Sequence, residues 1–481
     1  MSKETLRQVI IMLGLTLCGI SDGFVFGQMS GMINSLRGKD DQMSLSDDNV
    51  SWIASIINIT CPSGLALAAL LMEKLGRRRS ITTLTLPVII TWLMVYYGKD
   101  FITFAISRVI VGCSFGAVSI VSYISSAEYA SPRVRAILGN IVAIAGPSVG
   151  ISLGHILCIL FHWRTVALIG LIPAILSALL PFFFIESPYW LAFKGRFEEC
   201  EVAFRKLHGR TDSSEAELKL LVELERQKQN LKSRQKISIF THCKRMVNAF
   251  FQKSMIKVMF LGFGICIYRV AGGKILYSTM ALTMLQEITG SSNILLFTLV
   301  VDGCLILGSI LPCLLFIKFN MRPILFTLGL VTNITLIVLS ICIYFKPNDN
   351  IYFSWMCVSL LAFYLVTANA GPLAVIEVLI SEIFPLEIKS YCIFIFSTLS
   401  GVINFLSIKY AQIMFDTIGY YSVFLLNSSI ALLCLLIFWF YLPETKGRTL
   451  QEIELYFKNN RFSDDKTLDV EQLNHLLEIK A

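Results

Sequence analysis

The stretch from Glu186 to Ser254 opens with ESPYWL (Glu186 to Leu191) and continues through the charged tract EAELKLLVELERQKQ (Glu215 to Gln229). It is the only long polar stretch in the 481-residue chain, and it holds fourteen lysines and arginines. Strongly apolar sequence of similar length lies on either side, and each side divides into six hydrophobic runs. A polar connection between two sixfold apolar halves is typical of a carrier with twelve membrane spans.

The composition indicates a membrane protein. Hydrophobic residues make up 55% of the chain and charged residues only 15%, whereas a soluble chain would be about a quarter charged. The net charge of +8 fits the excess of basic residues on the cytoplasmic side of membrane proteins, so we expect no nucleic-acid partner. Eleven of the thirteen cysteines lie inside apolar runs and none shows paired spacing, which favours helix packing over disulfides or metal binding.

The apolar runs predict an all-α membrane protein with twelve transmembrane helices, because each run is near the ~20 residues needed to cross a bilayer. The predicted spans are 8–32, 50–72, 80–97, 101–125, 137–160, 165–185, 255–285, 293–317, 323–345, 351–380, 391–415 and 421–442. They define an N-terminal six-helix bundle (1–185), a cytoplasmic linker with short helices (186–254), a C-terminal six-helix bundle (255–442) and a cytoplasmic tail (443–481). The helical spacing of Leu218, Leu221 and Leu224 predicts a helix within the linker.

The basic residues predict the orientation of the chain. With a cytoplasmic N-terminus, cytoplasmic segments hold 31 of the 41 lysines and arginines, outer loops hold 5, and 5 lie within spans. This asymmetry places both termini and the linker in the cytoplasm. A seven-span receptor fits poorly, because an odd number of spans would put the basic C-terminal tail outside. No small-residue cleavage site follows the first run, so we expect an uncleaved anchor.

Charged residues recur at matched positions in the two halves. Glu128 and Glu382 are each followed seven residues later by a basic residue, and their offset is 254. Glu186 and Glu444 close the sixth and twelfth runs with an offset of 258. Recurrence at nearly one period predicts duplication of a six-helix unit.

These charges lie at the predicted cytoplasmic ends of helices, where arginine and carboxylate form directional bidentate pairs. We expect them to act as clamps that join the two halves and hold the cytoplasmic side shut, although they could serve only as topology signals. The predicted gate network consists of Glu73, Arg77, Arg78, Glu128, Arg135, Glu186, Arg322, Glu382, Lys389, Glu444 and Arg448.

Six short motifs stand out along the chain: EKLGRRR (73–79), RVIVGCSFG (108–116), EYASPRVR (128–135), ESPYWL (186–191), SEIFPLEIKS (381–390) and PETKGRTL (443–450). Taken together, they resemble the sugar porter family of the major facilitator superfamily, and most of all its insect facilitated trehalose transporters. The resemblance covers nearly the whole chain and implies two six-helix bundles, a central substrate cavity and alternating access.

The resemblance also implies which residues face the solute, and here the chain departs from the family. Family members carry glutamine in helix 5, two glutamines and an asparagine in helix 7, and tryptophan in helix 10. Neither 140–147 nor 370–377 holds the expected residue, and Tyr268, Arg269 and Lys274 stand at or near the helix 7 positions. Only Asn404 in helix 11 matches a family sugar contact. Met29 replaces the helix 1 aspartate of proton-coupled members, and this predicts transport that runs downhill only. The alternative is that Asp22 takes the place of that aspartate as a proton site.

Charges inside spans are expensive, so they should face a cavity or a partner. Arg269 and Asp302 lie at similar depths, roughly 21 and 22 Å above the predicted cytoplasmic helix ends, and we predict that they form an ion pair. Glu377 lies too near the cytoplasm to be the expected partner, and His155 is interpreted as a packing or interfacial residue.

Three functions remain open. The first is facilitative transport of a small polar solute, a sugar such as trehalose or glucose, across the plasma membrane. The second is a non-transporting sugar sensor on a carrier fold, and the third is a proton-coupled carrier of an anionic organic solute. We expect no enzymatic activity, cofactor or metal, and the expected partners are the solute and membrane lipid. The oligomeric state is left open.

Overall fold

The computed structural model describes residues 3–37, 45–130, 135–234, 253–291, 293–345, 351–385, 388–448, 452–453 and 456–457. These residues form helices and connecting turns, and none of them lies in a β-strand. Charged side chains are scarce along the long helices, whereas many large apolar side chains, such as those of Phe440 and Tyr352, are exposed. Exposed apolar surface on this scale is expected of helices that face lipid.

The first group of helices precedes the linker and includes one helix far too long for a single crossing. It consists of α1 (Lys3–Arg37), α2 (Asp47–Tyr97), α3 (Phe101–Tyr129), α4 (Arg135–Asn140), η1 (Ile141–Ala145), α5 (Gly146–Leu160), α6 (Trp163–Leu179) and η2 (Leu180–Phe183). The 51 residues of α2 would extend ~77 Å as one helix, against a hydrocarbon core of ~30 Å. Gly76 breaks it with φ of 84°, a left-handed conformation that glycine adopts without steric cost.

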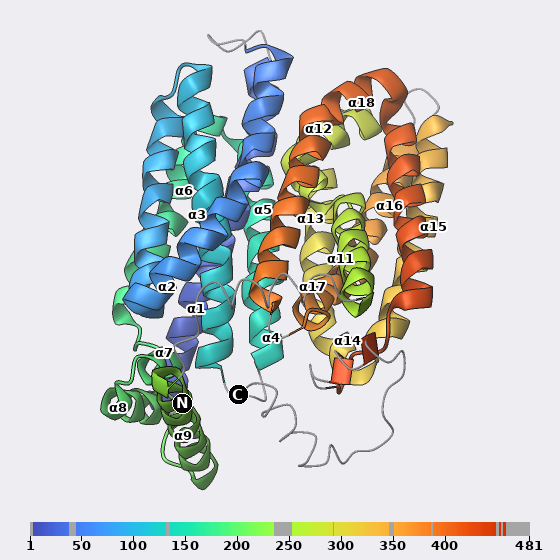
Figure 1. The fold of residues 1–481 in the computed structure, drawn as a ribbon. Helices are drawn as coiled ribbons and strands as arrows, with labels where there is room; N and C mark the ends of the chain where they lie inside the picture. The colour runs from blue at the N-terminus through green and yellow to red at the C-terminus, as the bar shows by residue number, and fades with distance from the viewer. Residues whose placement is uncertain are drawn as a thin grey trace.

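The second group follows the same plan. It consists of α11 (Lys253–Ala271), α12 (Lys274–Thr289), α13 (Leu295–Ile310), α14 (Pro312–Lys318), α15 (Met321–Tyr344), α16 (Ile351–Ala370), α17 (Pro372–Glu382) and α18 (Lys389–Tyr441). The 53-residue α18 is broken at Gly419, where φ is 79°, and Figure 1 shows it turning over there and returning. The described residues contain ten helical segments long and apolar enough to cross a membrane. Counting α2 and α18 as two crossings each gives the twelve predicted spans.

Figure 1 shows the first group on one side of the molecule and the second group on the other. The polar linker forms α7 (Pro188–Phe193), α8 (Phe197–His208) and α9 (Asp212–Arg234) at the end where the N-terminus lies. We call this end the linker face and the opposite end the far face. The predicted domain boundaries at 185, 254 and 442 stay a prediction.

Candidate solute site and gates

Two helices of the second group are interrupted at mid-span, and their breaks contact each other. The segment α11–α12 is broken at Gly272 and Gly273, where Gly273 has φ of 63°. The segment α16–α17 is broken at Gly371. The Tyr364 hydroxyl of α16 donates to the Gly272 carbonyl at 2.8 Å. The side chain of Leu373 lies 2.8 Å from the point where a Cβ on Gly272 would stand, so the two breaks pack closely against each other.

Beside these breaks, Arg269 forms an ion pair with Glu377 of α17, with Nε and Oε1 3.0 Å apart. The two side chains are 35% and 40% exposed. Lys274 lies within electrostatic range of both. The predicted pair of Arg269 with Asp302 is therefore wrong. It rested on depth alone, and successive helical residues point about 100° apart, so depth does not decide which neighbour a side chain meets.

Asp302 contacts His155 instead, and the interpretation of His155 as a packing residue misses this. The carboxylate accepts from the Tyr277 hydroxyl at 2.9 Å and lies 3.0 Å from His155 Nδ1. His155 Nε2 lies 3.0 Å from the Ser278 carbonyl, which can only accept, so Nε2 carries a proton. One further proton is shared between Nδ1 and the carboxylate. His155 and Asp302 are 0% and 1% exposed and join α5 of the first group to α13 of the second.

The other predicted cavity residues are not brought to Arg269 by hydrogen bonds or ion pairs between described residues. Tyr268 is buried and packs on Phe438, with ring centroids 6.0 Å apart. Met29 is fully buried in an apolar cluster. Asn404 is 7% exposed and makes no hydrogen bond to a described residue. Asp22 is 6% exposed and is likewise unpaired within the described part of the chain.

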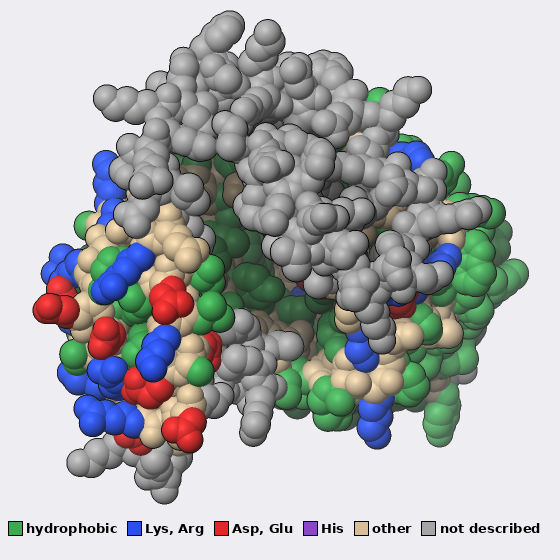
Figure 2. All heavy atoms as spheres, turned by 60° about the horizontal axis from the view of Figure 1, so that its bottom comes forward, with side chains coloured by type: hydrophobic (Ala, Val, Ile, Leu, Met, Phe, Trp, Pro, Cys, Tyr) green, Lys and Arg blue, Asp and Glu red, His purple; other side chains and the backbone are tan. Residues whose placement is uncertain are grey.

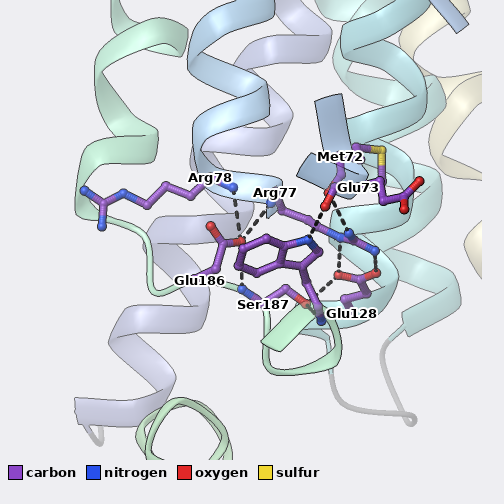
Figure 3. A network of polar contacts seen from close by, with 8 residues as sticks. Met72, Glu73, Arg77, Arg78, Glu128, Glu186 and Ser187 are labelled. Atoms are coloured by element: carbon purple, nitrogen blue, oxygen red, sulfur yellow. Dashed lines mark hydrogen bonds and ion pairs between the residues drawn. The ribbon is translucent and has the colours of Figure 1, made fainter. Parts of the chain in front are cut away.

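The linker face of the first group holds a network of charged and polar side chains, which Figure 3 shows. The Arg77 guanidinium donates to both oxygens of Glu128, with Nε to Oε2 at 2.8 Å. The Ser187 hydroxyl donates to the same carboxylate. The Trp190 indole donates to the Glu73 carbonyl at 3.1 Å, so the start of the linker is held to the ends of two spans.

Glu186 caps the span that begins after Gly76. Its Oε1 accepts from the backbone amides of Arg77 at 2.8 Å and Arg78 at 3.4 Å. A carboxylate is favourable at this position, because the first amides of a helix lack partners and carry partial positive charge. Glu186 Oε2 lies 2.6 Å from the point where a Cβ on Gly76 would stand, so the cap also depends on glycine.

The second group repeats the cap but not the ion pair. Glu444 accepts from the amides of Met321 at 3.1 Å and Arg322 at 3.0 Å, at the start of α15. The Arg322 guanidinium, however, donates to the Trp439 carbonyl and lies over the Trp439 ring. Glu382 Oε2 is buried without a partner among the described residues, and burial raises the pKa of this carboxyl.

Among the side chains that the structure describes, no ion pair joins the two halves at the linker face. The Arg77–Glu128 ion pair lies within the first group and the Glu444 cap within the second. Lys389 is partly buried near Glu382, and Arg448 is exposed. The Arg135 side chain lies outside the described residues. Cross-group contact at this face includes the Asn140 amide of α4, which donates to the Ser309 carbonyl at 2.9 Å.

A cross-group ion pair lies instead at the far face. Lys409 of α18 donates to Asp48 Oδ1 and, at 3.0 Å, to the Ser51 hydroxyl of α2. Its ammonium stands 4.6 Å from the centre of the Trp52 ring, and Trp52 packs on Phe405. Of the ion pairs found among described residues, this one and His155–Asp302 join the two groups. Both lie toward the far face, because Asp48 stands at the start of α2, His155 near the end of α5 and Asp302 in the first half of α13.

Figure 2 views the linker face and shows a hollow in it, lined by hydrophobic side chains. On the first-group side, a cleft of about 310 Å³ lies between α2 and α3, beside Arg77 and Glu73. The molecule is thus joined by cross-group ion pairs toward one face and hollowed at the other.

Comparison with known proteins identifies the family. The family model described as "Sugar (and other) transporter" matches residues 8–457. The Facilitated trehalose transporter Tret1 of Culex quinquefasciatus is 22% identical over 456 residues, covering 94% of this chain and 86% of that protein. Sugar transporter ERD6-like 7 of Arabidopsis thaliana is 25% identical over 451 residues, covering 91% and 92%.

Solved structures show the same fold. The xylose transporter XylE from E. coli in an inward-open conformation superposes with a TM-score of 0.74 at 20% identity, covering 93% of this chain and 99% of that one. XylE bound to 6-bromo-6-deoxy-D-glucose gives a TM-score of 0.72 at 21% identity, covering 94% and 100%. The family model spans nearly the whole sequence, and the chain is an integral membrane protein that belongs to the "Sugar (and other) transporter" family.

Proposed function

We propose that this protein is a facilitative carrier that moves a small polar solute, a sugar such as trehalose or glucose, by alternating access. It would reside in the plasma membrane with the linker face and both termini in the cytoplasm, an orientation supported by the asymmetry of basic residues. Two bundles, 1–185 and 255–442, would move about a solute site near Arg269, and the tail 443–481 would be cytoplasmic. The family and the sugar-transporting relatives support the solute class.

One observation carries the mechanism. Both cross-group ion pairs between described residues lie toward the far face, while the linker face is hollowed. A carrier must break such contacts to open outward and remake them to open inward, because contacts made in only one state set the equilibrium between states. The far-face pairs would therefore close the outer side during inward release.

The test is transport by the purified full-length chain in liposomes. Labelled glucose and trehalose should enter saturably until inside and outside concentrations are equal, and should exchange with preloaded unlabelled solute. An inward proton gradient should not drive accumulation, because methionine at position 29 cannot take up a proton. Accumulation above the outside concentration that is lost in Asp22→Asn would refute downhill transport. Absence of uptake and exchange for both sugars would refute the sugar assignment.

A further inference from the structure

The charges beside the broken helices do not balance. Arg269 and Lys274 supply two positive charges, and Glu377 supplies one negative charge. The Arg269 guanidinium is paired with Glu377 at 3.0 Å, but the Lys274 ammonium makes no ion pair or hydrogen bond with a described residue. One positive charge is therefore left over at mid-span, where an uncompensated charge is costly.

Other charged side chains of the spans do not supply the missing negative charge. Asp302 is occupied by His155 and Tyr277. Asp22 lies in the first group, and the charged groups that act on Lys274 are Glu377 and Arg269. The described residues therefore supply no further negative charge beside Lys274, and an anionic ligand would supply it.

The site is open to water although it lies in the middle of a span. Arg269 is 16 residues into α11, a rise of roughly 24 Å, and yet the Arg269 and Glu377 side chains are 35% and 40% exposed. Arg269 also lies within electrostatic range of Cys61 on α2 of the first group. A solute that reaches Arg269 would thus lie between the two groups.

The backbone adds to the positive character of the site. The helix α12 runs for 16 residues from Lys274, and Gly273 before it provides no side-chain cap. The first amides of such a helix lack carbonyl partners and carry partial positive charge. Broken transmembrane helices direct these ends toward anionic groups of transported solutes. The start of α12 and the unpaired ammonium of Lys274 therefore both favour a ligand with a negative charge.

From these observations we infer that Lys274, Arg269 and the start of α12 bind the anionic oxygens of a small, hydroxyl-rich organic anion that carries one carboxylate or phosphate. This inference rests on the proposed carrier function and specifies that, among small polar solutes, a sugar-like anion binds more tightly than a neutral sugar. Glu377 holds Arg269 in place between transport events and repels the same anionic group, so it limits the affinity.

The experiment measures binding and uptake by the purified full-length chain, in liposomes and in detergent, with three probes of similar size. Gluconate carries a carboxylate, glucose 6-phosphate carries a phosphate, and glucose is neutral. We expect at least one anion to bind at least tenfold more tightly than glucose. Lys274→Gln should weaken binding of the anion by roughly tenfold, the value of one charge-assisted hydrogen bond. It should leave the affinity for glucose unchanged, and Lys274→Arg should retain anion binding. Lys99→Gln removes an exposed lysine elsewhere and serves as the control.

Glu377→Gln separates binding from structural damage. Damage to the site would weaken the binding of every probe. Removal of the repelling charge should instead tighten binding of the anion and leave the affinity for glucose unchanged. Transport of glucose without binding of either anion would overturn this inference and leave the proposed function standing. No transport and no binding of any probe would overturn both. Equal effects of Lys274→Gln and Lys99→Gln on the anion would also overturn the inference.

Discussion

We expect the buried His155–Asp302 pair to stabilise closure of the far face, and Asp302→Asn tests this. The substitution keeps the size of the side chain and its hydrogen-bonding reach to Tyr277, but it removes the negative charge. A hydrogen bond to a charged group contributes about 1.5–3 kcal/mol and a neutral one about 0.5–1.5 kcal/mol. We therefore expect a loss of about 1.5 kcal/mol of closure, which corresponds to a roughly tenfold shift toward the outward-open state.

The assay is hydrogen–deuterium exchange of the purified protein, read by mass spectrometry. Backbone amides of α12 and α5 near the far face should exchange faster in Asp302→Asn, while segments at the linker face should exchange more slowly. Asp416→Asn is the matched control, because that carboxylate is exposed and accepts a hydrogen bond only from Gln412 of its own helix at 2.8 Å. Unchanged exchange in α12, with the thermal stability of the protein preserved, would refute the reasoning.

Three further changes test the gates. Lys409→Met should destabilise closure of the far face by about 0.5–1 kcal/mol, because its partner carboxylate is 72% exposed and exposed ion pairs contribute little. Hydrogen exchange at the far face should therefore accelerate less than in Asp302→Asn, and a larger acceleration would contradict this ranking. Gly76→Ala should lower the free energy of unfolding by about 1–3 kcal/mol, since φ is 84° and the new Cβ would meet the Glu186 carboxylate. Gly303→Ala should leave it unchanged, because no atom lies within 4 Å of the point where the new Cβ would stand. Arg77→Ala should lower the melting temperature by leaving a half-buried carboxylate unpaired, and a melting temperature equal to that of the wild type would show that the ion pair serves only as a topology signal.

The spans were accessible from the sequence because hydropathy and length determine where a helix can cross lipid, and the family was accessible from its six motifs. The Glu128 and Glu186 positions were also predictable, since their recurrence in the second half marks a repeated structural unit. Their partners were only partly predictable. Glu186 and Glu444 accept hydrogen bonds from backbone amides at helix starts. Every residue except proline has such an amide, so the sequence does not indicate which amides these carboxylates bind.

The contacts between groups were the least predictable part of the site. Asp302 and Arg269 stand at similar distances from their predicted cytoplasmic helix ends, but the choice of partner depends on helix rotation, which hydropathy does not record. His155 is the only histidine or charged residue in the predicted span 137–160, and Lys409 is the only one in 391–415. A single residue of this kind is compatible with packing, lipid headgroups or a partner on a distant helix. Matching His155 to Asp302 by their distance from the far-face helix ends would have been the available signal.

The internal capping of each group has a consequence for how the polypeptide can be divided. The first group takes its cap from Glu186, before the linker helices, and the second group takes its cap from Glu444, after its last span. Neither helix start borrows a residue from the other group. Two separately synthesised polypeptides, one ending after α9 and one beginning before α11, would each complete their own helix ends. Contacts between the groups, among them those of Asn140, His155 and Lys409, would then hold the two polypeptides together in the bilayer.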